Sequence, residues 1–208
     1  MRLQSFGSCV VAAALAGAGA SCGEYVQDQG RSPSQIVIQS LGGARGDAPS
    51  QFGNPLVSDV ETTITTPEPC STTTPCLTVF NDVGQVTMSI ILKDPGQPGV
   101  STVPSDLNAV TINRYRVQYR RSDGRNTPGV DVPYPIDSAV TATITASGAT
   151  FAFELVRNDA KREAPLRQLR ASSTVLSTIA DVTFYGRDQA GNDVIATGSL
   201  GINFGDFQ

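Results

Sequence analysis

Apolar and polar residues alternate along most of the chain after its first thirty or so residues, and this alternation predicts β-strands. The clearest strand is segment 85–92. Its apolar side chains fall on one face at a period of two: Val86, Met88, Ile90 and Leu92. Further strands are predicted for these segments: 35–40, 56–66, 109–121, 138–146, 151–155, 179–187 and 194–204.

Segment 109–121 shows a break in its alternation. Val110 and Ile112 have one parity. The later apolar residues have the other: Tyr115, Val117 and Tyr119. An extra residue in one strand of a pair produces such a change, so we expect a β-bulge near Asn113 or Arg114.

Two hairpins are predicted from the spacing of the strands. Segments 138–146 and 151–155 are separated by a Ser147–Gly148 turn and are expected to pair. The second hairpin consists of segments 179–187 and 194–204 with the turn 188–193.

Segment 158–170 is the one markedly charged stretch. Residues 159–163 can start a helical turn, which Pro165 limits. We expect a loop with a short helical turn and a solvated, charged surface. Together with the strands, this pattern predicts an all-β fold, an antiparallel β-sandwich of about 7–8 strands, with a barrel as the alternative.

The first residues have the form of an export signal. Arg2 precedes an apolar run at 10–20, and small residues lead to Cys22. The run is shorter than the roughly 20 apolar residues that a membrane-spanning helix needs. We therefore expect a signal peptide at 1–21, a polar flexible tether at 22–34 and a single domain at 35–208.

The cysteines support an exported protein. Cys70 and Cys76 bracket a turn-prone stretch and are expected to form a local disulfide in an oxidising compartment, the alternative being two reduced or metal-linked thiols. The sequence contains no histidine, which disfavours a zinc site. Cys9 falls within the leader, so Cys22 would be a lone thiol, and lipidation would account for it.

The small residues before Cys22 resemble the lipobox of bacterial lipoproteins, in which the cysteine becomes the acylated first residue. That resemblance implies membrane attachment through an N-terminal lipid anchor. Gly23, in place of Asp, implies sorting to the outer membrane if the organism has one. Gly19 departs from the Leu preferred at its position. The alternative is an ordinary signal cleaved after Ala20, which would give a soluble secreted or periplasmic protein.

The segment Tyr185–Asn192 contains a D-x-A-G-N turn between two strands. It resembles the last hairpin of bacterial immunoglobulin-like domains. The resemblance covers roughly the last 30 residues and implies an extracytoplasmic module for adhesion, spacing or binding, with no chemistry of its own. The chain differs from antibody-type domains in lacking Trp and a long-range cysteine pair.

Composition argues against several classes of function. Without the leader, 14 basic side chains stand against 19 acidic ones, and this mildly acidic balance disfavours a nucleic-acid partner. The absence of histidine removes the common triads, His-based proton transfer and His-ligated metals. The acidic residues are scattered singly through turns, and we find no phosphate-binding loop. We expect no enzyme activity, no cofactor and no metal.

Three short features invite a functional interpretation, and for each a structural role is simpler. The Arg-Gly-Asp tripeptide at 45–47 matches an integrin-binding motif but lies in a Gly-rich loop. Asp188, Asn192 and Asp193 offer oxygens that suit Ca²⁺ but occupy positions typical of turns. Some aromatic and basic residues suit a sugar or peptide surface, although strand alternation explains most of them. They are Tyr115, Tyr119, Tyr134, Arg114, Arg116, Arg120 and Arg121.

These observations lead to one expected function and two alternatives. We expect a non-catalytic cell-envelope lipoprotein that carries an immunoglobulin-like module for binding or spacing. Its partners would be the membrane, through the lipid anchor, and other envelope proteins or glycans. The alternatives are a carbohydrate-binding module, which the low aromatic content of 6% disfavours, and a subunit of a surface assembly that pairs through edge strands.

Overall fold

The computed structural model describes residues 31–94, 96–97, 99 and 102–207. Cys22 and the expected leader lie outside these residues. The chain divides after Arg31, and every described strand belongs to the unit Ser32–Gln208. Among the described residues, no helix combines the length and apolar character that crossing a membrane requires.

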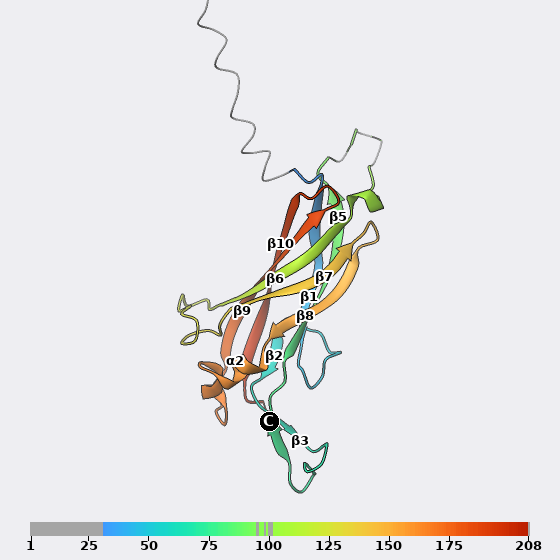
Figure 1. The fold of residues 1–208 in the computed structure, drawn as a ribbon. Helices are drawn as coiled ribbons and strands as arrows, with labels where there is room; N and C mark the ends of the chain where they lie inside the picture. Colours follow the sequence, from blue (N-terminus) through green and yellow to red (C-terminus); the bar gives the residue numbers. More distant parts are fainter. Residues whose placement is uncertain (1–30, 95, 98, 100–101, 208) are drawn as a thin grey trace, which may run out of the picture. The chain divides into compact units, whose positions relative to one another are not determined.

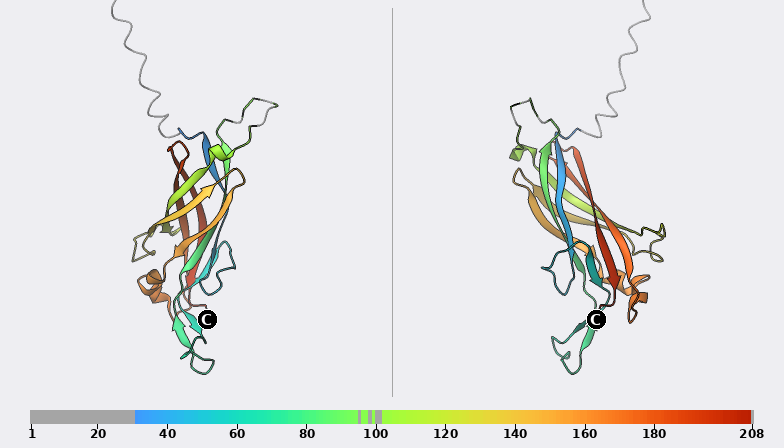
Figure 2. Two further views of the ribbon diagram at one scale, coloured as in Figure 1. Left: turned by 45° about the vertical axis from the view of Figure 1, so that its right-hand side comes forward. Right: turned by 180° about the vertical axis from the view of Figure 1, so that it is seen from behind.

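Two sheets face each other across an apolar core (Figure 1; Figure 2). The smaller sheet has the order β1 (Ser34–Ala44), β5 (Asp82–Leu92), β8 (Ala149–Val156). The larger has the order β2 (Leu56–Asp59), β10 (Asp193–Gly205), β9 (Leu176–Asp188), β6 (Val110–Arg120), β7 (Ile136–Ile144). All neighbours are antiparallel except β2, which runs parallel to β10. The prediction of an all-β sandwich is confirmed.

The core consists of the apolar faces that the alternation predicted. Val86 and Met88 of β5 and Phe184 of β9 are completely buried. The Phe184 ring meets Phe151 and Phe153 of β8 edge-on, with ring centroids 5.7 and 5.3 Å apart. Such edge-to-face aromatic pairs contribute about 0.5–1.5 kcal/mol each beyond the area they bury. Aromatic contacts therefore join the centre of one sheet to the edge of the other.

Strand β6 contains the expected bulge. Its register slips between Ile112 and Arg114. Against β9, Asn113 is the extra residue, because Ile112 and Arg114 face the consecutive residues Gly186 and Tyr185. Against β7 the slip has the opposite sense, and two residues of β7 lie opposite Asn113. The slip turns Tyr115 and Tyr119 into the core, where their hydroxyls donate to backbone carbonyls of β8. Because of the bulge, the even-numbered apolar residues before it and the odd-numbered ones after it face the same core.

The predicted pairing of segments 138–146 and 151–155 is wrong, although both are strands. β7 pairs with β6, while β8 pairs with β5 in the other sheet, and a single bridge between Thr145 and Gly148 closes the turn that joins them. Alternation shows which side chains face the core, but it does not show which strand lies alongside. The chain crosses between the sheets at this turn because the β8 aromatic rings pack against Phe184 on the facing sheet.

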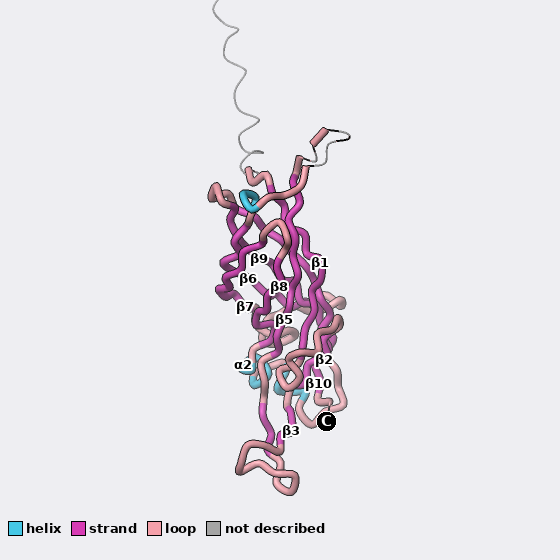
Figure 3. The backbone as a smooth tube through the Cα atoms, turned by 90° about the vertical axis from the view of Figure 1, so that its right-hand side faces the viewer, coloured by secondary structure: helices cyan, strands magenta, loops and turns pink. Residues whose placement is uncertain are grey.

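The second predicted hairpin is confirmed, since β9 and β10 pair along their whole length around the Asp188–Asn192 turn. Segment 56–66 forms two short strands, β2 and β3 (Thr62–Ile64), and β3 pairs with β4 (Cys76–Thr78). Residues 62–78, which we call the β3–β4 arm, form a separate small sheet (Figure 3). Within the described part of the chain, helical structure is limited to η1 (Asp106–Asn108), α2 (Asn158–Arg162) and η2 (Leu166–Leu169), and α2 ends before Pro165 as expected.

The strand directions define two ends of the sandwich. At the proximal end, β1 begins at Ser34, whose hydroxyl donates to the Asn108 carbonyl over 3.1 Å, and β9 ends at Asp188. At the distal end, β9 begins at Leu176, β10 finishes beside β2, and the β3–β4 arm leaves the sandwich (Figure 1; Figure 3). The 13 residues of β9 join these ends, a length of roughly 40 Å at the usual rise of a strand.

Candidate functional site

A buried ion pair closes the distal end of the sandwich. Lys161 of α2 extends its ammonium to 2.8 Å from Oδ1 of Asp82 at the start of β5, and both side chains are at most 2% exposed. The Gly46 amide donates to the same oxygen at 3.2 Å, and the Ser58 hydroxyl donates to Oδ2 at 2.5 Å. Burial raises the pKa of Asp82, and Lys161, Ser58 and Gly46 offset only part of the rise. Both carboxylate oxygens therefore have donors inside the protein.

This pair corrects the expectation that the charges of segment 158–170 form a solvated surface. Arg162 is exposed, as predicted, but its neighbour Lys161 is among the most deeply buried side chains of the described chain. Its partner lies 79 residues earlier, so no local pattern marks the contact. A single lysine in a charged stretch carries no local signal that distinguishes a buried, paired lysine from an exposed one.

The Arg-Gly-Asp tripeptide belongs to the same structural cluster. Arg45 donates to both oxygens of Asp47, at 2.8 and 2.7 Å, and its guanidinium lies 3.3 Å from Asp59. The hydrogen bond from Arg45 lowers the pKa of Asp47. A Cβ on Gly46 would overlap with the carbonyl oxygen of Asn81. The charges of the tripeptide are thus paired with each other and with the fold, and the turn interpretation is confirmed.

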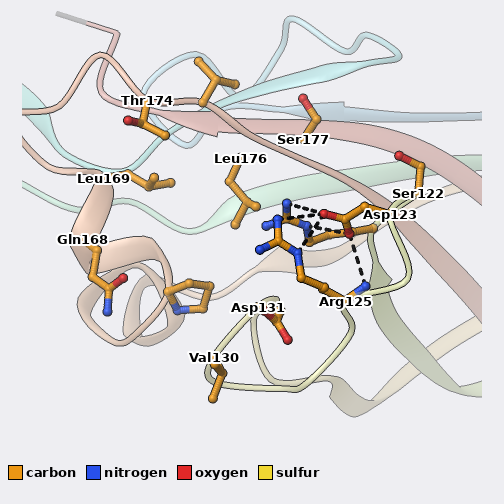
Figure 4. A pocket seen from close by; sticks show the side chains of 13 residues that line it. Ser122, Asp123, Arg125, Val130, Asp131, Gln168, Leu169, Thr174, Leu176 and Ser177 are labelled. Atoms are coloured by element: carbon orange, nitrogen blue, oxygen red, sulfur yellow. Dashed lines mark hydrogen bonds and ion pairs between the residues drawn. The ribbon is translucent and has the colours of Figure 1, made fainter.

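An open pocket of about 560 Å³ lies between the β6–β7 loop and the segment that leads through η2 into β9 (Figure 4). Its lining comes from two parts of the chain. These residues are Arg121, Ser122, Asp123, Arg125, Val130, Asp131, Pro165, Gln168, Leu169, Thr174, Val175, Leu176 and Ser177.

Two arginines dominate the polar wall of the pocket. Arg121 and Arg125 both bind Asp123, with Nη2–Oδ2 distances of 2.7 and 2.9 Å, as the dashed lines in Figure 4 show. Hydrogen bonds from the two arginines lower the pKa of Asp123, which stays ionised. Each guanidinium uses only Nε and Nη2 for these bonds, so Nη1 of each can serve an external acceptor.

Aliphatic side chains also line the pocket. Leu169 and Leu176 are buried beneath it, while Val130 and Val175 are 66% and 48% exposed. Cationic donors beside exposed aliphatic groups suit a ligand with an acceptor or anionic group next to an apolar part. Of the aromatic and basic residues that the sequence analysis named as a possible binding surface, only Arg121 contributes to this pocket.

The other aromatic and basic candidates do not form a common surface. Tyr115 and Tyr119 are buried, whereas Arg114, Arg116 and Arg120 point to the outer face of the larger sheet. Arg114 pairs with Asp137 at 2.8 Å and stacks on the Tyr185 ring at 4.4 Å. Tyr134, which is 57% exposed, packs against Gly129. Alternation between core and surface therefore explains these residues, as expected.

The candidate calcium ligands form a turn. Asp188 Oδ1 accepts hydrogen bonds from the amides of Ala190 and Asn192, and Oδ2 accepts one from the Asn192 side chain, all between 2.8 and 2.9 Å. Asp193 pairs instead with Arg187 at 3.0 Å. Within the described part of the chain, no group of three or more Cys, Asp or Glu residues is placed to hold a metal ion.

The predicted disulfide is present and lies in the β3–β4 arm. Cys70 and Cys76 are bonded, with their Cα atoms 5.3 Å apart. Cys22, the predicted lipidation site, falls outside the described residues.

Comparison with known proteins gives no relative. No family model matches the chain, and neither any curated protein nor any solved structure matches it.

Proposed function

We propose that this protein is a non-catalytic cell-envelope lipoprotein, anchored through Cys22, whose sandwich presents its distal end to other envelope components. One observation carries the proposal. The chain enters the sandwich at the proximal end, whereas the open pocket and the β3–β4 arm lie at the distal end. A module attached at one end and equipped for contacts at the other suits binding or spacing in an envelope.

The length of the tether supports this arrangement. Nine residues, 23–31, separate Cys22 from the unit that begins at Ser32. Fully extended, they reach about 30 Å at most. A membrane anchor at Cys22 would therefore keep the proximal end within that distance of the lipid. The roughly 40 Å length of β9 would then place the pocket clear of the headgroups when the sandwich stands upright on the membrane.

The strand order supports an immunoglobulin-like module. Without the β3–β4 arm, and with β1 and β2 counted as two halves of one strand, the sandwich has seven strands in chain order: β1/β2, β5, β6, β7, β8, β9 and β10. The first, second and fifth of these (β1, β5 and β8) form one sheet. The third, fourth, sixth and seventh (β6, β7, β9, β10) form the other, with β2 alongside the last. This is the division of a constant-type immunoglobulin sandwich with the fourth strand moved to the opposite sheet. The D-x-A-G-N turn between β9 and β10 agrees with that assignment.

Metabolic labelling with a clickable palmitate analogue tests the anchor. The wild-type protein should take up label, and Cys22→Ser should abolish it. Cys9→Ser is the matched control, because Cys9 lies in the expected leader and its loss should leave labelling intact. An unlabelled wild-type protein would refute the lipoprotein assignment.

Photocrosslinking tests the role of the distal end. A photoreactive amino acid replacing Val175, in the pocket, should yield adducts with envelope components in intact cells. The same probe replacing Leu107, which is 85% exposed at the proximal end, should not yield those adducts. Arg125→Glu should weaken the Val175 adducts, because it reverses a charge in the polar wall of the pocket. Equal adducts from both probe positions would contradict a binding role for the distal end.

A further inference from the structure

The tip of the β3–β4 arm has an unusual composition. Of the 11 residues 65–75, six carry a hydroxyl group and three are proline. No helix or strand forms between β3 and β4. Exported segments rich in Ser, Thr and Pro are typical of O-glycosylated stalks, since proline prevents regular structure and leaves the hydroxyls accessible.

A tight turn presents these hydroxyls at the end of the arm. The amides of Ser71 and Thr74 each donate to the other residue's carbonyl, at 2.9 and 3.2 Å, and Thr72 and Thr73 occupy the tip between them. The Cys70–Cys76 disulfide closes the loop outside this turn. The side chains of Thr72, Thr73 and Thr74 are all exposed.

The hydroxyls of this turn differ from those on the sheets. On the strands, exposed threonines pair across neighbours, as Thr87 does with Thr150 at 2.9 Å and Thr111 with Thr143 at 3.2 Å. In the turn, Ser71 and Thr73 share a hydrogen bond. Among the described residues, the hydroxyls of Thr72 and Thr74 have no hydrogen-bond partner, so attaching a group to either would disturb no contact in the fold.

We propose that Thr72 and Thr74 are sites of O-linked glycosylation. The donor would be a sugar activated as a phosphate ester, either nucleotide-linked or lipid-linked. The Thr Oγ1 atom forms a bond to the anomeric carbon of the sugar, and the bond from that carbon to the phosphate oxygen breaks. The phosphate leaves with the electron pair, and the hydroxyl proton passes to a base of the transferase. This inference rests on the export that the proposed function assumes.

The sugars would have a physical consequence at the distal end. Bulky, hydrated groups on the turn would cover the exposed Leu77 of β4, which is 61% exposed, and would shield the disulfide-closed loop from proteases. Because the arm shares no strand with the two main sheets, this cover would leave the pocket and the core unchanged.

The test is mass spectrometry of proteolytic peptides from the full-length protein, purified from the cells to which it is native. The peptide containing residues 70–76 should carry additional sugar mass, and fragmentation that preserves glycosidic bonds should locate it on Thr72 or Thr74. Thr72→Ala with Thr74→Ala should remove that mass. The control, Thr141→Ala with Thr143→Ala on exposed positions of β7, should retain it.

The same samples are assayed for palmitate label, which separates this inference from the proposed function. Labelled protein whose 70–76 peptide has its unmodified mass would overturn the glycosylation sites and leave the anchor intact. Sugar found only outside residues 70–76 would overturn them as well. Glycosylated but unlabelled protein would support the sites and refute the anchor, and protein with neither modification would refute both.

Discussion

At the residue scale, the main consequence of the structure is a charge pair inside the sandwich. Removing Lys161 and Asp82 from water carries a desolvation penalty of several kcal/mol per ion, which their mutual attraction and two further donors offset in part. Such a pair adds little net stability, but removing either residue is costly because the other charge is left buried without its partner. The pair joins the start of β5 to α2 and so fixes how the distal end closes.

Replacing Lys161 with methionine should lower the free energy of unfolding by about 3–5 kcal/mol, because Asp82 would be left buried without its cation. Urea denaturation monitored by circular dichroism measures the change. Arg162→Met is the matched control and should change stability by less than about 0.5 kcal/mol, since Arg162 is exposed. Equal effects from the two substitutions would show that Lys161 is not buried.

Asp188 should make stability depend on pH. Burial alone would raise its pKa, but hydrogen bonds from Asn192, Ser32 and Ala190 outweigh that effect, so the pKa lies below its ordinary value. Its contribution is therefore complete above the unfolded-state pKa of about 3.9 and is lost as the pH falls through the folded-state pKa.

Asp188→Asn should consequently be less stable than the wild type at about pH 6, and the difference should shrink steadily towards about pH 2. Urea unfolding across that range measures the difference. Asp94→Asn, the same kind of substitution in the β5–β6 loop, is the matched control. A wild-type-to-variant difference that stays constant with pH would contradict the proposed hydrogen-bond stabilisation of the Asp188 carboxylate.

At the element scale, the sequence predicts which side chains face the core but not which strands become neighbours. The alternation in β5, β9 and β10, the bulge in β6 and the last hairpin could all be read from local patterns. The separation of β7 from β8 could not, because it depends on aromatic contacts of β8 with Phe184, which is distant in sequence. The split of segment 56–66 into β2 and β3 likewise depends on pairing with β10 and β4.

The bulge provides a test of the β6 register. Deleting Asn113 would leave Ile112 inward, Arg114 outward and Tyr115 inward, an uninterrupted alternation, so the core contacts would survive. Deleting Gln118 would instead disturb the burial of Tyr119, whose hydroxyl donates to the Leu155 carbonyl at 2.6 Å. We expect the Asn113 deletion to fold and the Gln118 deletion to be the less stable by at least about 2 kcal/mol. Urea unfolding of both variants checks this, and the reverse order of stability would contradict the observed register.

At the scale of the whole molecule, the two sheets and the arm are separate structural parts. The arm has its own two strands and its own disulfide, and it shares no described strand with the sandwich. The sequence predicted the disulfide because two nearby cysteines in an exported chain favour one. The distal pocket could not be predicted, because the β6–β7 loop and the η2–β9 segment meet there only after the sheets assemble.

Replacing both Cys70 and Cys76 with serine should cost about 2 kcal/mol or less, because the closed loop is short and lies outside the sandwich. The strand signal in circular dichroism should remain, and the urea midpoint should fall only modestly. The loss of cooperative unfolding in the double variant would contradict the independence of the arm.

The central claim is that the protein is anchored at its proximal end and presents its distal end away from the membrane. Its most direct test is fluorescence quenching of the lipidated protein in vesicles that carry a headgroup-linked quencher. A fluorophore is attached either at Ala190→Cys, in the proximal β9–β10 turn, or at Leu77→Cys, on the distal arm. We predict strong quenching at position 190 and weak quenching at position 77. Equal quenching at both positions, or stronger quenching at position 77, would contradict the account.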